Sequence, residues 1–294
     1  MASSQLPFAS IENEFLRVDY LTTTGPRIIG LHTKGMEGNL FAETPDVHWP
    51  VPHGEFYLRG GHRLWKAPED SFYNCPEEGV TVIAGESVIL RSPVDVSGLE
   101  KEIEFRLDGN CVHLSHRITW HGETPLELAP WTITQLRLNS MGILPLEGVA
   151  GGASAPNRSI VIWPYTSLKD ERLELHDDFI LVQGIPGDVP LKIGGLNTHG
   201  WLACALGNAL FVKRFAIEEG VFPDMNSNVE VYVKDVCIEL ELLGSLRMLK
   251  KGDSAVMSET WEVHVGEFPV TFETARQVCR QLSNLSTNGE KNSK

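Results

Sequence analysis

Residues 59–69 read RGGHRLWKAPE and gather chemically active side chains in a chain that is otherwise acidic. Arg59, Arg63 and Lys66 supply hydrogen-bond donors, and Trp65 supplies a flat aromatic face. His62 carries an imidazole that can titrate near neutral pH. Sugars need this combination, because their hydroxyls take donors and their C–H groups stack on aromatic rings. The stretch therefore predicts one wall of a sugar cleft. The alternative is a structural turn whose arginine side chains cap backbone carbonyls.

A glycine pair, Gly60 and Gly61, stands between Arg59 and His62. Glycine tolerates positive φ angles and lets another backbone approach closely. We therefore expect a loop at the lip of the cleft.

A second stretch, CIELELL at 237–243, alternates carboxylates with apolar side chains. In a strand, Glu239 and Glu241 share one face with Cys237, about 7 Å apart. If this face is enclosed, repulsion and desolvation raise the pKa of one carboxyl, as a general base working near neutrality requires. If the face is open to water, the two are ordinary surface glutamates.

The sequence contains no motif typical of a metal or nucleotide site, such as HExxH or a Walker loop. His113 and His116 look like a metal-binding pair, but residues three apart on a strand point to opposite faces. We therefore expect no metal and no cofactor.

Composition limits the possible partners of this 294-residue chain. Its formal net charge of −14 disfavours nucleic acid and anionic membrane surfaces as partners. Five widely spaced cysteines without a CxxC argue against a disulfide framework. The first residues lack the basic and apolar segments of a signal peptide, so we expect a cytoplasmic protein.

Short alternating runs separated by glycine turns dominate the chain and predict an antiparallel all-β sandwich. Hairpins are expected around Gly85, Gly109 and Gly207. A helical period appears only near the end, at 271–283. We expect one domain over 1–284 and a disordered polar tail over 285–294.

Taken together, these segments resemble the galactose mutarotase-like superfamily, from GPRIIGL near the start to SETWEVHV near the end. Within it, an uncharacterised bacterial branch carries a GGHRLW-like stretch and an ELE-like strand. The resemblance implies an antiparallel β-supersandwich with a sugar cleft on one concave face. The helical period near the end adds a short C-terminal helix, which we expect to end the domain.

The resemblance also implies roles for particular residues. Arg63 is similar to the substrate-orienting arginine of aldose epimerases, with His62 where asparagine is usual. Glu239 in CIE is similar to their general base. Trp131 stands where the family has its acid histidine, so His62, or else His113 or His199, would have to protonate the sugar ring.

The resulting hypothesis is an aldose epimerase or mutarotase that acts at the anomeric carbon, with Glu239 as base and His62 as acid. The residues expected to contact the sugar are Arg63, Arg59, Trp65, Trp131, His199 and Glu241. One alternative is a carbohydrate-binding protein that lost the acid. Another is a lyase or isomerase for an acidic sugar, suggested by the cluster of Arg59, Arg63 and Lys66.

Overall fold

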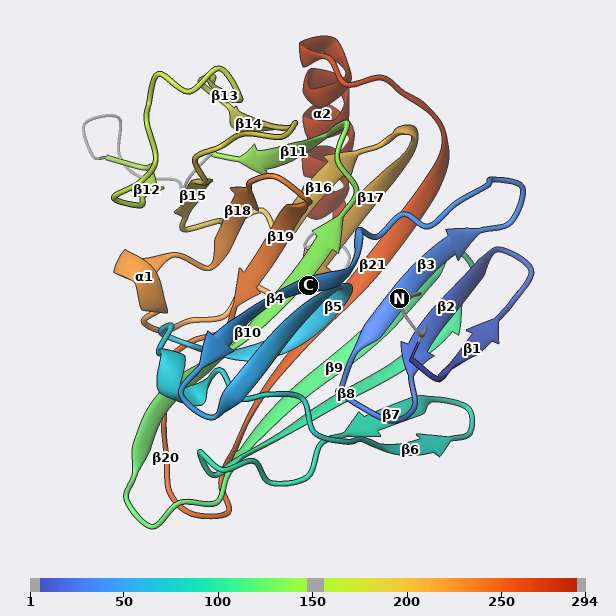
Figure 1. Ribbon diagram of the computed structural model, residues 1–294. Coiled ribbons are helices and arrows are strands. Elements are labelled where there is room, and N and C mark those ends of the chain that lie inside the picture. Colours follow the sequence, from blue (N-terminus) through green and yellow to red (C-terminus); the bar gives the residue numbers. More distant parts are fainter. Residues whose placement is uncertain (1–5, 147–155, 290–294) are drawn as a thin grey trace.

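The computed structural model describes residues 6–146 and 156–289, which form two large antiparallel sheets packed face to face (Figure 1). The first sheet has eleven strands: β1 (Phe8–Glu12), β2 (Leu16–Leu21), β3 (Ile28–Thr33), β4 (Glu43–Val51), β5 (Gly54–Ala67), β10 (Leu126–Leu136), β12 (Val161–Ile162), β15 (Leu191–Gly195), β18 (Val229–Val233), β19 (Ile238–Leu243) and β20 (Arg247–Leu249). The predicted antiparallel β-sandwich is confirmed.

The second sheet has ten strands and contains the expected hairpins. They are β6 (Thr81–Ala84), β7 (Val88–Arg91), β8 (Leu99–Asp108), β9 (Cys111–Trp120), β11 (Ser140–Pro145), β13 (Leu173–Leu175), β14 (Phe179–Gly184), β16 (Trp201–Ala205), β17 (Gly207–Phe215) and β21 (Ser254–Phe268). Strands β6 and β7, β8 and β9, and β16 and β17 pair as predicted. Alternation places Ile103 and Phe105 of β8 in the core between the sheets, because successive strand residues point to opposite faces.

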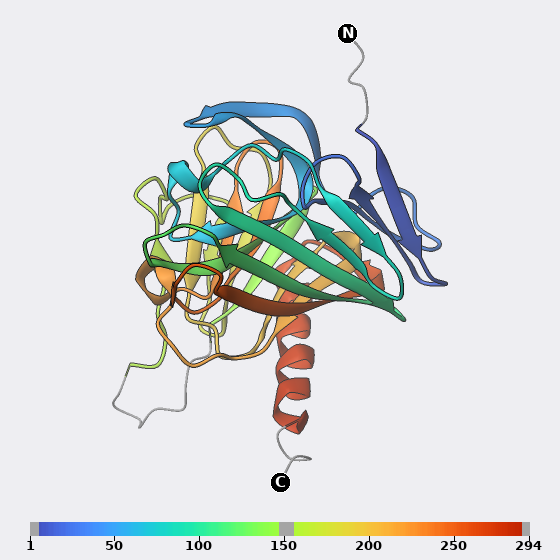
Figure 2. The same ribbon diagram turned by 90° about the horizontal axis from the view of Figure 1, so that it is seen from below.

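The helices are few. A 3₁₀ turn η1 (Ser71–Tyr73) and a short α1 (Pro223–Asn226) lie in connections, and the longer α2 (Phe272–Gly289) follows β21. The apolar face of α2 packs on the outer side of the second sheet, and Figure 2 shows the helix extending away from the sandwich. Among the described residues, no helix is long and apolar enough to span a membrane.

Helix α2 runs further than predicted. Residues 285–289, expected in a disordered tail, are helical, and 290–294 lie outside the described residues. The prediction ended the helix where the apolar face ends, near Leu282. Backbone hydrogen bonding from residue i to i−4 needs no such face and continues for a further turn or two.

The glycine pair lies inside strand β5 and not in a loop, so that expectation was wrong. Arg59, Gly60 and Gly61 have φ angles of 59°, 83° and 70°. This break lets the first half of β5 pair with β4 and the second half with β10. A Cβ atom at Gly60 would collide with the carbonyl oxygen of Ala42, and one at Gly61 with that of Ile28. Close approach of neighbouring backbones therefore requires both glycines.

This contact generates a prediction. Gly60→Ala should lower the free energy of unfolding by at least about 3 kcal/mol, because backbone strain and a backbone clash add together. The matched control is Gly35→Ala, whose glycine has a φ of 86° with nothing near its missing Cβ. This control should lower the free energy of unfolding by about 1–2 kcal/mol, from backbone strain alone. Urea denaturation measures both variants, and equal losses would contradict the role assigned to close approach.

Candidate active site

A pocket of about 440 Å³ opens on the outer face of the first sheet. Strands β5, β10, β19, β18 and β15 form its floor, since they follow one another in the sheet and each contributes side chains. The hairpin of β4 and β5 adds Trp49 and Leu58, and Tyr165 comes from the chain just after β12.

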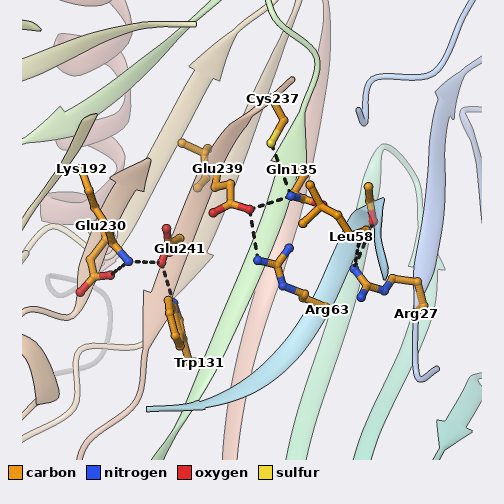
Figure 3. A network of polar contacts seen from close by, with 12 residues as sticks. Arg27, Leu58, Arg63, Trp131, Gln135, Lys192, Glu230, Cys237, Glu239 and Glu241 are labelled. Carbon is orange, nitrogen blue, oxygen red and sulfur yellow. Dashed lines mark hydrogen bonds and ion pairs between the residues drawn. The ribbon is translucent and has the colours of Figure 1, made fainter. Parts of the chain in front are cut away.

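Glu239 occupies the floor of this pocket between two donors. Arg63 Nη2 lies 3.2 Å from its Oε1, and Gln135 Nε2 donates to the same oxygen at 2.7 Å (Figure 3). Glu239 is 7% exposed, so the carboxyl is enclosed and not a surface group. Burial raises the pKa of Glu239 above its ordinary value, although Arg63 opposes this shift. A carboxyl with a raised pKa is suited to exchange a proton near neutrality.

Glu241 belongs to a second group of charges beside the first. Its Oε2 accepts hydrogen bonds from Trp131 Nε1 at 2.7 Å and Lys192 Nζ at 2.9 Å. Lys192 also pairs with Glu230 at 2.6 Å (Figure 3). Burial alone would lower the pKa of Lys192, but the two carboxylates raise it above its ordinary value, so the ammonium stays charged. Burial raises the pKa of Glu230 well above its usual range.

Aromatic rings form the walls of the pocket. Trp65 and Trp131 meet edge to face with centroids 5.7 Å apart. The guanidinium of Arg63 lies 4.5 Å over the Trp65 ring, and Lys192 Nζ lies 4.6 Å over Trp131. These cation–π contacts fix charged and aromatic groups side by side.

The pocket brings together five of the residues singled out from the sequence: Arg63, Trp65, Trp131, Glu239 and Glu241. They come from three strands that adjoin in the order β5, β10, β19. The other three, His62, Arg59 and His199, lie elsewhere.

His62 points into the interior between the sheets, so the expectation that it shares a cleft with Glu239 was wrong. It is fully buried, and its Nε2 lies 2.8 Å from His116 Nε2. The physical reason is the strand pleat: Arg63 faces the pocket, and its neighbour must therefore face the other way. Burial, followed by the charge of His116, lowers the pKa of His62 well below its ordinary value.

Arg59 and His199 line separate clefts. The break in β5 directs Arg59 over Tyr57 and toward Glu77, 3.6 Å from its Nε, on the far side of the β4–β5 hairpin. His199 lies in the connection from β15 to β16, where the chain crosses from the first sheet to the second. It lines a groove there together with His113.

Several pocket residues were missed from the sequence: Gln135, Tyr165, Lys192 and Tyr232. Glu230, which pairs with Lys192, was missed as well. A weak signal existed for Lys192, because it is the single polar side chain of its strand, LKIGG. Alternation alone could not show that β10 adjoins β19 on one side and that β15 lies two strands away on the other.

Within the described residues, His62, His116 and Glu259 could be considered as metal ligands, since their ligand atoms lie within 4.8 Å of one another. Reasoning from spacing along one strand overlooked them, because they come from β5, β9 and β21. Two nitrogens bound tetrahedrally at about 2.0–2.1 Å would stand about 3.3 Å apart, further than the 2.8 Å between the histidines. Lys213 also already neutralises Glu259, so a divalent cation would leave two net positive charges sealed from water. The cluster fits a shared proton better than a metal.

The fold is that of galactose mutarotase-like proteins. A galactose mutarotase-like protein from Lactobacillus casei matches with a TM-score of 0.52 and 10% identity, over 88% of this chain and 100% of that one. A candidate aldose 1-epimerase from Escherichia coli matches with a TM-score of 0.52 and 11% identity, over 88% and 99%. A candidate mutarotase from Salmonella typhimurium matches with a TM-score of 0.56 and 10% identity, over 87% and 90%. At this identity the likeness concerns the fold alone.

The sequence itself gives no such match. Neither the models of known protein families nor the curated proteins contain a significant match to it. The chemistry of the pocket therefore has to be argued from its own side chains.

The buried histidines generate a prediction about acid stability. Burial, the largest cause, lowers the pKa of His116 to about 4, while Glu259 opposes the shift. The unfolded chain takes up this proton near pH 6.5 and the folded one only near pH 4, so stability should fall as the pH drops through this window. The loss attributable to His116 is about 3 kcal/mol. Urea denaturation at several pH values should show a flatter decline for His116→Gln than for the wild type. Parallel curves would contradict the assignment.

Proposed function

We propose that the protein binds a neutral aldose in this pocket and transfers protons at its anomeric centre, as a mutarotase or aldose epimerase does. The observation that carries the proposal is the buried Glu239 carboxyl, with its raised pKa, held between Arg63 and Gln135 on a pocket floor walled by tryptophans. The fold neighbours described as mutarotase-like add an argument by analogy.

Polar atoms without a partner support a polyol as the ligand. Among the described residues, Arg63 Nε and Nη1, Gln135 Oε1 and Glu241 Oε1 are buried and make no hydrogen bond. The first two atoms are donors and the last two are acceptors. A hydroxyl group can donate and accept at once, so a sugar that displays several hydroxyls would satisfy both kinds. An apolar ligand would leave them unpaired, at a cost in free energy for each.

The charges of the pocket favour a neutral sugar over an acidic one. The cations that line the pocket are already paired with carboxylates: Arg63 with Glu239, Lys192 with Glu241 and Glu230, and Lys234 with Asp235. Two of the three cations that suggested an acidic substrate do not contribute, because Arg59 lies in another cleft and Lys66 donates to the carbonyl of Pro68. A carboxylate or phosphate on the ligand would have to compete with the carboxyls of Glu239 and Glu241 for the same cations.

In the proposed reaction, Glu239 removes the proton of the anomeric hydroxyl. The C1–O1 bond gains double-bond character, the bond from C1 to the ring oxygen breaks, and that oxygen takes a proton. We assign this second proton to Tyr232, because it pairs in register with Glu239 and lines the same pocket. Burial raises the pKa of Tyr232, so the phenol is protonated at neutral pH, and it donates because the ring oxygen becomes a basic alkoxide as its bond to C1 breaks. Rotation about the C1–C2 bond and the reverse steps yield the other anomer.

A second candidate function is sugar binding without catalysis. The observation that favours it is Trp131, which stands where the resemblance places the acid histidine and donates to Glu241 instead. No histidine lines the pocket among the described residues. A tryptophan face stacks on a sugar ring but transfers no proton.

Glu239→Gln separates the two functions. The amide keeps the shape of the side chain and an acceptor oxygen, so sugar affinity should change by only a few fold. Acceleration of anomer exchange should fall by about 10²–10⁴ because an amide is no base. Calorimetry gives the affinity, and exchange NMR with D-glucose and D-galactose gives the rate.

The control is Glu104→Gln, a carboxylate on β8 that lies in the groove of the other sheet. It should change neither quantity. If the wild type binds sugar but does not accelerate anomer exchange, sugar binding without catalysis replaces the proposed catalytic function. Full activity in Glu239→Gln would show that Glu239 is not the base.

The charge argument gives its own prediction. Thermal shift with matched pairs, D-glucose against D-glucuronate and D-galactose against D-galacturonate, should show stabilisation by the neutral member and little by the acid. The extra carboxylate would face Glu239 and Glu241. Stronger stabilisation by the uronates would instead favour the lyase or isomerase alternative.

A further inference from the structure

Directly beneath the pocket, a chain of fully buried polar side chains joins the two sheets. Lys213 of β17, Glu259 of β21 and His116 of β9 come from the second sheet. His62 of β5 and Thr132 of β10 come from the first sheet. Charged side chains are seldom buried so completely, and these occupy space that apolar side chains could fill.

The charged centre of this chain is the ion pair of Lys213 and Glu259. Lys213 Nζ lies 3.3 Å from Glu259 Oε2, which also accepts from the Thr132 hydroxyl at 2.9 Å. The same ammonium donates to the carbonyl of Leu240 at 3.2 Å. Trp261 Nε1 donates to the other oxygen of Glu259 at 2.8 Å. One buried ion pair is therefore tied to β10 and β19 of the opposite sheet.

The histidine pair supplies a second connection. His62 Nε2 meets His116 Nε2 at 2.8 Å, and His62 Nδ1 lies 2.9 Å from the Thr134 hydroxyl. His62 Nε2 also lies 3.8 Å from Glu259 Oε1, beyond hydrogen-bond distance, so the histidine pair sits beside the ion pair. Strand β5 is thereby bonded to β9 and β10.

Every first-sheet member of this network is the immediate neighbour of a pocket residue. His62 precedes Arg63, and Thr132 follows Trp131. Thr134 precedes Gln135 in the same way, and the Leu240 carbonyl lies between Glu239 and Glu241. Because successive strand residues point to opposite faces, a bond on the inner face fixes the Cα position of the side chain on the outer face.

We propose that the Lys213–Glu259 pair and the His62–His116 pair are positioning residues, which hold β5, β10 and β19 so that Arg63, Gln135, Trp131 and Glu239 meet in the pocket. Directional bonds explain why this interior is polar. A buried ion pair adds little stability over apolar side chains of similar volume, whereas hydrogen bonds of defined geometry fix the register between two sheets that could otherwise slide. Contacts among the pocket residues themselves are short, so small shifts of the strands matter.

The test removes the charges as a pair, in Lys213→Met/Glu259→Gln. No unpaired charge remains, and the glutamine can still accept from Trp261 or Thr132, so thermal stability should stay within a few degrees of the wild type. The matched control is Leu90→Met, a volume-conserving change in the same core on β7, three strands away from β21.

The first readout needs no ligand. In protein labelled with 5-fluorotryptophan, we expect the ¹⁹F resonances of Trp65 and Trp131 to shift or broaden in the double variant, while that of Trp120, the last residue of β9, stays in place. The control variant should leave all three unchanged. Unchanged Trp65 and Trp131 resonances in a stable double variant would overturn the proposal.

The second readout rests on the proposed function. The double variant should bind D-glucose or D-galactose at least about tenfold more weakly, or accelerate anomer exchange at least about tenfold less, at a temperature where it is fully folded. Normal affinity and rate would show that the network is structural only. If the wild type binds neither sugar, the proposed function fails, and the fluorine resonances still decide on positioning.

Discussion

The structure depends on an ion pair that is sealed between two sheets. Lys213 and Glu259 lie with no exposed side-chain surface at the centre of the sandwich, and each would be costly to bury alone. Burial by itself would raise the pKa of Glu259, but Lys213 and the hydrogen bonds around it lower the pKa below its ordinary value. The carboxylate therefore stays ionised and keeps its bonds to both sheets. The pair fixes how one sheet lies on the other, and hence which strands can carry a site.

Because the strand is pleated, neighbouring residues face opposite sides of the sheet and have different roles. In RGGHRLW, His62 faces inward to the histidine pair, and Arg63 faces outward to Glu239. The glycines just before them let the backbones of β3 and β4 approach. A stretch that reads as one chemical cluster thus serves three tasks: strand packing, the inter-sheet network and the pocket. Its cations do not form an anion-binding site, because the break in β5 directs Arg59 into another cleft.

The same fold carries different side chains in the proteins that share it, since identities of 10–11% preserve the architecture and little else. Here the pocket has an arginine beside a glutamate and presents Trp131 where the resemblance places a histidine. Proton donation at the ring oxygen then falls to a phenol in the proposed reaction. Function on this fold follows from such substitutions in the pocket and not from the sandwich itself.

The sequence by itself determined the β-sandwich and its hairpins, because alternation and turn residues are local properties of the chain. That the arginine stretch and the glutamate strand share a site was implied by the resemblance to the superfamily and not by periodicity. The sequence also specified that Glu239 and Glu241 share a face. It could not show that this face is enclosed, nor that Lys192 and Gln135 join it, because strands far apart in the chain become neighbours only when the sheet is ordered. His62 illustrates the limit most clearly. Its residue type indicated acid–base chemistry, but the face it occupies was decided by the register of β5 against β10 and by the second sheet that covers it, which are tertiary facts.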